Sequence, residues 1–548
     1  MGATPRTSLE LAPSTSCALT SAGVAASAAR SVAATDGAPT EVPTEAELLD
    51  KDVPTSASVA ELGGAGPLEP ERISFLKGLM AFIGPGFLVS MAYIDPGNLA
   101  SDINQGVQAG YTLIWVTLWC TVLGFVMQMM AAKLGVATGR HLAEHARENY
   151  PIFPRMVLWV LVELGVIACD MIEVIGGAVA LNTLSNGAVP LWAGVLITAC
   201  SAFGVLLLER AGMRVLEAVL VALIMTMGGT FFYMFFSTDV DYVEALKGMV
   251  IPRLNGHTIP YAVGAIGAII MPHNLYLHSG LMMSRSDYIA VVSVRRALRF
   301  VKVESAIALT LSLMINISII SVFSGAFYNS LVAPQVGLGN AGFELGKMFG
   351  TAIRIIWAVG LLAAANASTV TSTYAGQIVM DGFWNWKISI WWRTLAVRLI
   401  TLGPTLLVAV FLRNGDASFD TLTEWLNIVQ SLVLPFVVIP LLLFTSSERI
   451  MGEHASRPWF TVVMSIFTAI LIGMNGYLAV TFGLSELPSE DWARFLFALI
   501  CTVYLTFMGY LIVGVERSAR WWAKSKSFLK TRARLVCARP ADMMEVHL

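Results

Sequence analysis

Apolar stretches of about 20 residues follow one another along the chain from Arg72 to about Val515, separated by polar segments. An α-helix of that length crosses the ~30 Å hydrocarbon core of a bilayer, because it rises about 1.5 Å per residue. The pattern therefore predicts about twelve transmembrane helices. Their centres lie near Phe87 (a run that continues to Gln108), Leu123, Ile167, Leu196, Met225, Ile270, Ser312, Leu361, Thr401, Val433, Ile470 and Val503.

Residues 1–70 differ from the rest of the chain, because Ala, Ser, Thr, Pro and Gly dominate and no apolar periodicity is present. Such a composition does not bury enough apolar surface to fold, so we predict a disordered cytosolic tail. The segment does not begin with a basic stretch followed by an apolar one, so we do not interpret it as a signal peptide.

The composition supports burial in a membrane. Hydrophobic residues make up 56% of the 548 positions and charged residues only 13%, against about 25% charged residues in soluble domains. The net charge is −2 and no stripe of Lys and Arg is interleaved with aromatic residues, so we exclude nucleic acid as a partner. The six cysteines are scattered singly and form no CxxC pair, which favours packing thiols over disulfides or a cysteine metal site.

Basic residues indicate the orientation, since the cytosolic loops of membrane proteins carry an excess of Lys and Arg. With the N-terminus in the cytosol, the loops expected inside are rich in these residues and the opposite loops hold few. The inside loops contain Lys133, Arg140, Arg147, Arg155, Arg210, Arg214, Arg285, Arg295, Arg296, Arg299, Lys387, Arg393, Arg449 and Arg457, and the outside loops mainly Lys247, Arg253, Lys347 and Arg413. We therefore predict an integral multi-pass protein with both termini cytosolic, in the plasma membrane or an endosomal, lysosomal or vacuolar membrane.

A turn motif interrupts the first apolar segment, Asp95-Pro96-Gly97-Asn98. Pro96 removes a backbone donor and Gly97 admits a positive φ, so we expect the helix to break here. Unsatisfied backbone groups cost several kcal/mol in hydrocarbon, so such a break persists only where it is buried or lines a cavity. A carboxylate at mid-membrane costs at least ~2.5–3.5 kcal/mol, which favours a functional role for Asp95 over a simple packing kink.

The sixth segment contains a second interruption, Met271-Pro272-His273, followed by His278. Five segments in each half, with a central Pro break in the first and the sixth, are typical of a five-plus-five inverted repeat whose binding site lies at the two breaks. A lone Pro kink or a lone Met is usually a packing feature, and each histidine could equally cap a helix or hydrogen-bond within the bundle. The two matched breaks together favour a binding site.

The donors near the two breaks suit a transition-metal ion. Asp95 offers an anionic oxygen, Asn98 an amide oxygen, and the breaks free carbonyls such as those of Ala92 and Ala268. Met271 adds a soft thioether, which contributes little to Mg²⁺ or Ca²⁺ and shifts the preference toward Mn²⁺, Fe²⁺ and later metals. A single carboxylate leaves net positive charge on a divalent ion, so binding should be reversible, as a carrier requires.

At these motifs the chain resembles the natural resistance-associated macrophage protein (NRAMP) family of divalent metal transporters, and the resemblance runs through the first ten segments. It implies an all-α membrane protein with a LeuT-like fold, in which helices 1 and 6 are broken. It also implies proton-coupled import of Mn²⁺ and Fe²⁺ into the cytosol by alternating access, with Cd²⁺, Co²⁺ and Zn²⁺ as further substrates. The metal and the protons are then transported substrates, the lipid bilayer is the surrounding partner, and no resident cofactor is implied.

The resemblance also assigns the metal ligands by position. They are Asp95, Asn98 and Met271, with the carbonyls of Ala92 and Ala268 contributing in different states and Asn427 approaching the metal when the site closes. Met271 is retained here, whereas relatives that have shifted to magnesium or aluminium lack it. Asn366 and Val433 stand where many relatives have Gln, which leaves gating and rate open.

The family's proton route uses acids of the third segment. Here Asp170 and Glu173 lie three residues apart on one helical face. With His273 and Arg398 they would form a polar chain from the metal site toward the cytosol, and His278 and Glu304 are weaker candidates for the same pathway. The alternative is that Asp170 and Arg398 form a structural ion pair that holds two helices together.

We divide the chain accordingly into four parts: the disordered tail (1–70), a ten-helix inverted-repeat transport core (71–446), two additional transmembrane helices (447–516) and a basic cytosolic tail (517–548). Two other interpretations stay open, a metal sensor that retains the fold and an organic-solute symporter of the same architecture. An enzyme is not expected, because the HExxH ligand set of a metallohydrolase is absent from the sequence. The physiological metal and the oligomeric state are also open.

Overall fold

A computed structural model describes residues 89–210, 213–283, 293–330, 336–386, 388–411, 415–485 and 491–513. These residues are helical apart from short connections, and no strand occurs among them. The predicted tails (1–70 and 517–548) lie outside the described residues, as does the centre of the first apolar stretch.

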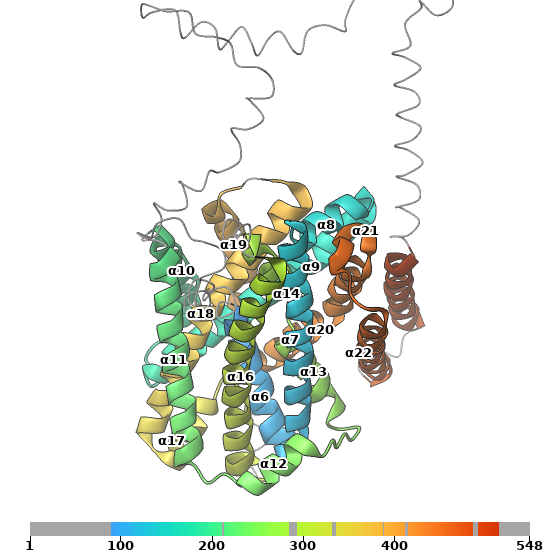
Figure 1. Cartoon of the computed structure of the whole chain (residues 1–548). Coiled ribbons are helices and arrows are strands. Elements are labelled where there is room, and N and C mark those ends of the chain that lie inside the picture. Colours follow the sequence, from blue (N-terminus) through green and yellow to red (C-terminus); the bar gives the residue numbers. More distant parts are fainter. Residues whose placement is uncertain are drawn as a thin grey trace, which may run out of the picture. The chain divides into compact units, whose positions relative to one another are not determined.

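Long helices occupy the predicted membrane segments (Figure 1). They are α6 (Pro96–Ala109), α7 (Ile114–Thr138), α9 (Ile152–Leu184), α10 (Leu191–Arg210), α11 (Met213–Ser237), α13 (Ile259–Ile269), α14 (Pro272–Leu281), α16 (Val294–Phe327), α18 (Thr351–Trp384), α19 (Ile390–Phe411), α20 (Gly415–Ser446), α22 (Pro458–Ser485) and a last helix, Asp491–Val513. Every predicted centre among the described residues falls on one of these helices, except Ile270, which lies between α13 and α14. Seven described helical stretches are long and apolar enough to cross a membrane, and the total of twelve crossings stays a prediction.

Short helices occupy several connections that we predicted as loops. They are η1 (Gly110–Leu113), α8 (Leu142–Asn149), α12 (Tyr242–Val250), α17 (Ala341–Phe349), α21 (Glu448–Met451) and η4 (Gly452–His454). Local capping explains two of them. Asp241 accepts hydrogen bonds from the amides of Val243 and Glu244 at the start of α12, and the Glu144 carboxylate accepts one from the His141 amide at the start of α8.

The two predicted breaks are present. The chain turns at Ala92–Asp95 before α6 begins at Pro96, and two residues, Ile270 and Met271, separate the end of α13 from the start of α14 at Pro272. Our expectation of a positive φ at Gly97 is wrong, because Gly97 lies in the first turn of α6. Glycine is needed there for space: a Cβ would lie 3.0 Å from Asp95 Oδ2 and 3.0 Å from Asn427 Oδ1.

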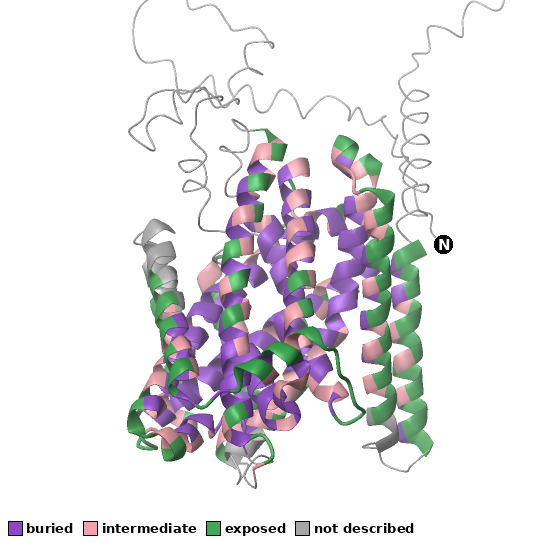
Figure 2. Ribbon diagram, turned by 60° about the horizontal axis from the view of Figure 1, so that its bottom comes forward, coloured by how far each residue is buried: buried purple, intermediate pink, exposed green. Residues whose placement is uncertain are grey.

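One helix, α9, connects much of the bundle, since it packs along α18 and also contacts α6, α10, α14, α19 and α20. α6 packs along α16, and the two lie side by side in Figure 1. Figure 2 shows buried residues gathered inside the bundle and largely exposed helices at its edge. Only 22% of the most apolar stretch of α22 is buried and 11% of that of the last helix, against 78% for α20, so these two helices present apolar surface suited to lipid.

Candidate functional site

The first break holds the Asp95 carboxylate at the amino end of α6. Asp95 is the N-cap: its Oδ1 accepts a hydrogen bond from the Asn98 amide (2.9 Å) and its Oδ2 one from the Gly97 amide (3.2 Å). The side chain is fully buried. The break therefore supplies the backbone donors and the positive end of the helix dipole that stabilise a carboxylate at this depth.

The Asn98 side chain connects the two breaks. Its Nδ2 lies 3.1 Å from the Ala92 carbonyl, 3.1 Å from the Ala268 carbonyl and 2.5 Å from Asp95 Oδ1. Two N–H bonds therefore face three oxygens, while Asn98 Oδ1 is buried with no hydrogen-bond partner among the described residues. Oxygens from both breaks thus converge on one point, where the partial positive charge of an amide NH₂ now lies.

Met271 brings a sulfur atom to the same place. It is the N-cap of α14 and is buried in one small apolar cluster with Ala92 and Cys169. Its Sδ lies 4.0 Å from Cys169 Sγ. The structure therefore brings together the carboxylate, the amide, both carbonyls and the thioether that the sequence singled out.

Asn427 approaches from α20. Its Nδ2 donates to the Gly97 carbonyl (3.1 Å), and Asn427 Oδ1 and Asp95 Oδ2 occupy the space beside Gly97 that a Cβ would need. Asn427 Oδ1 is buried without a hydrogen-bond partner among the described residues. A polar side chain of α20 thus lies against the turn that carries Asp95.

Two glycines let α9 pack directly on both breaks. A Cβ on Gly176 would lie 2.5 Å from Pro96 Cγ, and one on Gly165 would lie 3.3 Å from Pro272 Cγ. The two glycines are about three helical turns apart, on one face. The stretch between them carries Cys169 and Glu173, so this packing places both side chains beside the junction of the two breaks.

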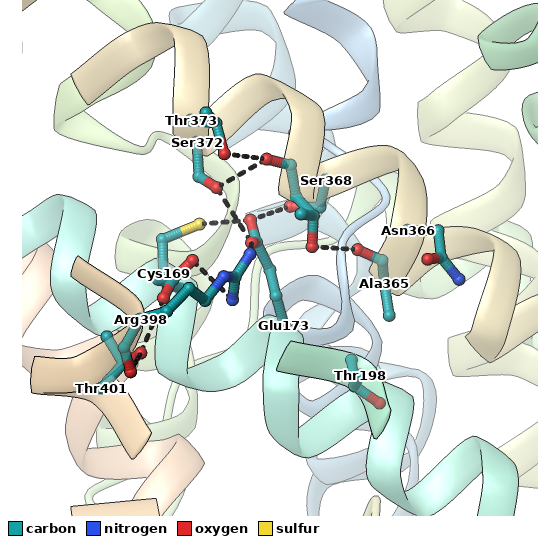
Figure 3. A network of polar contacts seen from close by, with 12 residues as sticks. Cys169, Glu173, Thr198, Ala365, Asn366, Ser368, Ser372, Thr373, Arg398 and Thr401 are labelled. Carbon is teal, nitrogen blue, oxygen red and sulfur yellow. Dashed lines mark hydrogen bonds and ion pairs between the residues drawn. The ribbon is translucent and has the colours of Figure 1, made fainter. Parts of the chain in front are cut away.

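Glu173 is the centre of a hydrogen-bond network that spans α9 and α18 (Figure 3). Its Oε1 accepts from Ser368 Oγ (2.7 Å) and Cys169 Sγ (3.3 Å), and its Oε2 accepts from Ser372 Oγ (2.9 Å). Arg398 Nη2 lies 3.9 Å from Oε2. Three donors and a guanidinium thus surround a carboxylate that is fully buried.

The network continues along α9 and α19. Arg398 Nη1 lies 2.7 Å from Asp170 Oδ1, and Asp170 Oδ2 accepts from Thr401 Oγ1 (2.8 Å). Next to this pair is a water-sized cavity of about 10 Å³, which Asp170, Arg398 and Arg393 help to line. Arg393 forms an ion pair with Glu163 (2.9 Å), which is 15% exposed. Carboxylates on one face of α9 thus extend from Glu173 to a partly exposed position.

The two histidines that we predicted for the proton pathway make no polar contact with this network among the described residues. His273 and His278 are buried, but no hydrogen bond or ion pair among the described residues joins either of them to Asp170, Glu173 or Arg398. His278 Nδ1 lies 2.9 Å from Gln128 Oε1 on α7, and His273 Nδ1 has no partner in the described part of the chain.

Several polar residues of the site were missed by the sequence analysis, namely Cys169, Ser368, Ser372, Glu163 and Arg393. Glu163 could have been found, because it lies seven residues before Asp170 on the same helical face. The α18 serines carry no local signal. Asn366 of α18, which stands where many relatives have Gln, accepts a hydrogen bond from Ser201 of α10 (3.2 Å).

The donor set differs from that of a resident metal centre. In the described part of the chain, no group of three or more His, Cys, Asp or Glu side chains is arranged to hold a metal ion. The convergent donors are instead one carboxylate, one amide, backbone carbonyls and a thioether.

A family model described as natural resistance-associated macrophage protein-like matches residues 86–481. The chain belongs to the Nramp family. It is 45% identical over 469 residues to metal transporter Nramp3 of Arabidopsis thaliana, covering 85% of this chain and 91% of that protein. It is 44% identical over 459 residues to the metal transporter nramp1 homolog of Dictyostelium discoideum, covering 83% and 85%.

Solved structures agree with this assignment. A crystal structure of a manganese transporter mutant from Eremococcus coleocola is similar with a TM-score of 0.71 at 28% identity, covering 82% of this chain and 97% of that one. The predicted family and LeuT-like fold are thereby confirmed. This Nramp protein is an integral multi-pass membrane protein that transports metal ions, and the members of its family are transporters rather than enzymes.

Proposed function

We propose that this Nramp protein imports divalent transition metals, above all Mn²⁺ and Fe²⁺, into the cytosol together with protons by alternating access. The observation that carries the proposal is the convergence of oxygens from both helix breaks and the Met271 thioether on one buried point. A relative of known structure is named a manganese transporter, which agrees with this choice of substrate.

The metal step follows from the chemistry of the donors. The Asn98 NH₂ group lies among three oxygens, and a cation there would repel it. Rotation of the amide by 180° would present Oδ1 instead, so that the amide oxygen joins the Asp95 carboxylate and the two carbonyls around the ion. The Met271 sulfur favours Mn²⁺, Fe²⁺ and Cd²⁺ over the harder Mg²⁺ and Ca²⁺.

The proton step uses the chain of polar groups on α9. Glu173 contacts Cys169, which contacts Met271, so Glu173 is the proposed first acceptor beside the metal site. The proton then passes by way of Asp170 and Arg398 and the water-sized cavity to Glu163. We keep His273 as a proposed member of the pathway, because its buried Nδ1 is unpaired among the described residues two positions after Met271.

The alternative for Asp170 and Arg398 is a purely structural ion pair. Breaking a buried pair on one side costs about 3–5 kcal/mol of stability, so a structural role predicts loss of folded protein. A role in the proton pathway predicts folded protein whose metal uptake no longer responds to a pH gradient. Asp170→Asn distinguishes these outcomes when uptake is normalised to folded protein.

Uptake by proteoliposomes tests the proposed function. Wild-type protein should take up Mn²⁺ and Fe²⁺ faster with an inward proton gradient and should exclude Mg²⁺. Asp95→Asn should lower Mn²⁺ uptake on the order of 100-fold, since it removes the one charged donor. The matched control is Asp241→Asn, which alters another helix N-cap at an exposed position on α12 and should keep normal uptake. Normal uptake by Asp95→Asn at equal protein amounts would refute the assigned site.

A further inference from the structure

Pro435 lies inside α20, two turns beyond Asn427. Pro435 has no N–H, so the carbonyl four residues earlier, that of Ser431, loses its helical partner. A freed carbonyl persists in a membrane helix only when another group satisfies it. Here the Asn475 side chain of α22 does so: its Nδ2 donates to the Ser431 carbonyl (2.7 Å), and its Oδ1 accepts from Ser431 Oγ (2.7 Å).

The last helix contacts the same turn. Tyr504 donates its hydroxyl to the Leu432 carbonyl (2.8 Å), and its ring packs edge-on against Phe436 at 4.8 Å between centroids. The consecutive carbonyls of Ser431 and Leu432, in the turn before Pro435, therefore accept hydrogen bonds from two different helices. Both of these helices are otherwise largely exposed, yet Asn475 is buried to 99%.

The turn that precedes Pro435 also contacts a broken helix. α13 packs so closely on α20 that a Cβ on Gly267 would overlap the Asn427 carbonyl and lie 2.8 Å from the Ser431 amide. Gly267 is four residues before Met271. The stretch from Asn427 to Ser431 is thus contacted by α13, which leads into the metal site, and by α22 from outside the predicted ten-helix core.

From these contacts we infer that Asn475 and Tyr504 are positioning residues for transport: the last two helices brace α20 beside Pro435 and so hold Asn427 against the turn of Asp95. The inference rests on the proposed function, in which Asn427 approaches the metal as the site closes. Two helices outside the predicted core would then act on the transport cycle rather than only face lipid. Without the brace, α20 can bend at Pro435 and the closed arrangement becomes less populated.

A double-mutant cycle tests the inference. Asn475→Leu has a similar size but removes both the N–H donor and the amide oxygen, and we expect its maximal Mn²⁺ uptake rate to fall about threefold to tenfold with less than a twofold change in KM. Tyr504→Phe should give a smaller fall of the same kind. Tyr510→Phe, which removes a hydroxyl from the same helix, is the control and should keep the wild-type rate.

The decisive comparison uses Asn427→Ala as the background. If Asn475 acts through Asn427, then Asn475→Leu should change the already lowered rate by less than twofold, because effects of coupled residues do not multiply. A merely structural role predicts the full fall in both backgrounds, which would overturn the inference, as would a wild-type rate in Asn427→Ala. Should Asn475→Leu not fold, Tyr504→Phe in the two backgrounds decides the matter.

The failure of this inference differs from that of the proposed function. If Asp95→Asn abolishes uptake while the effects of the Asn475 and Asn427 substitutions on the uptake rate multiply, the proposed metal site is supported and the positioning role of Asn475 is refuted. If Asp95→Asn transports normally, the proposed site itself is wrong.

Discussion

Adding one methyl group to α9 should disrupt the site without touching a proposed ligand. Gly176→Ala places a Cβ 2.5 Å from Pro96 Cγ, whereas ordinary contacts begin at 3.4 Å. The proline ring is rigid and belongs to the first turn of α6, so neither partner can move aside cheaply. α9 and the break must therefore separate by roughly 1 Å, with an overpacking cost of about 1–3 kcal/mol.

The displacement is large on the scale of metal coordination. Metal–oxygen bonds to small divalent ions are about 2.0–2.3 Å long, so a shift of about 1 Å in the turn next to Asp95 takes its carboxylate out of bonding range of the other donors. The same shift moves Glu173, which is carried by α9. We expect Mn²⁺ uptake by Gly176→Ala to fall at least tenfold at equal amounts of folded protein.

The matched control is Gly264→Ala. Gly264 is a buried glycine of α13, and a Cβ there would meet no other atom within 4 Å, apart from its own helix. This variant should transport at the wild-type rate and should be equally stable or slightly more so, because Ala favours a helix over Gly by about 1 kcal/mol. Uptake and thermal unfolding are measured for both variants. Equal uptake by Gly176→Ala and Gly264→Ala would refute the idea that close packing of α9 sets the site.

Three further predictions concern single side chains. Met271→Ala should retain some Mn²⁺ uptake but lose discrimination against Ca²⁺ and Mg²⁺, and unchanged competition between these ions would count against the thioether. Ser372→Ala removes one of the hydroxyls that hold Glu173, so the pH profile of metal-evoked proton entry should shift, while an unaltered profile would separate Ser372 from coupling. In α8, burial lowers the pKa of His145 from 6.5 to about 4, so the neutral ring stabilises the fold fully above pH 6.5. This stability is lost, by about 1.4 kcal/mol per pH unit, as the pH falls from 6.5 toward 4, and thermal unfolding of His145→Gln should be less sensitive to pH across this window.

Much of the architecture could be predicted from the sequence, because a run of apolar residues long enough to span a bilayer indicates a transmembrane helix. The breaks were also predictable, since Asp95-Pro96 and Met271-Pro272 place groups that cannot continue a helix inside such runs. Asn427 is different: nothing in its neighbourhood marks it, and it was assigned only by family resemblance.

The network around Glu173 could not be predicted from local patterns. Ser368 and Ser372 reach it from almost 200 positions further along the chain, so their contact depends on how α9 and α18 are rotated against each other. Cys169 looked like a packing thiol because it is single and surrounded by apolar residues. We expected Gly97 to be needed for a positive φ, whereas its small size is needed to admit Asn427 beside Asp95.

In the proposed site, a carboxylate, an amide and a thioether from the two breaks bind one divalent cation. Anomalous diffraction from crystals of the protein grown with Mn²⁺ can locate that cation. We expect an anomalous peak in coordination range of Asp95, Asn98 and Met271, and loss of this peak in Asp95→Asn crystals. A Mn²⁺ peak elsewhere in the membrane region, or one that persists between the breaks of the variant, would contradict the proposed site.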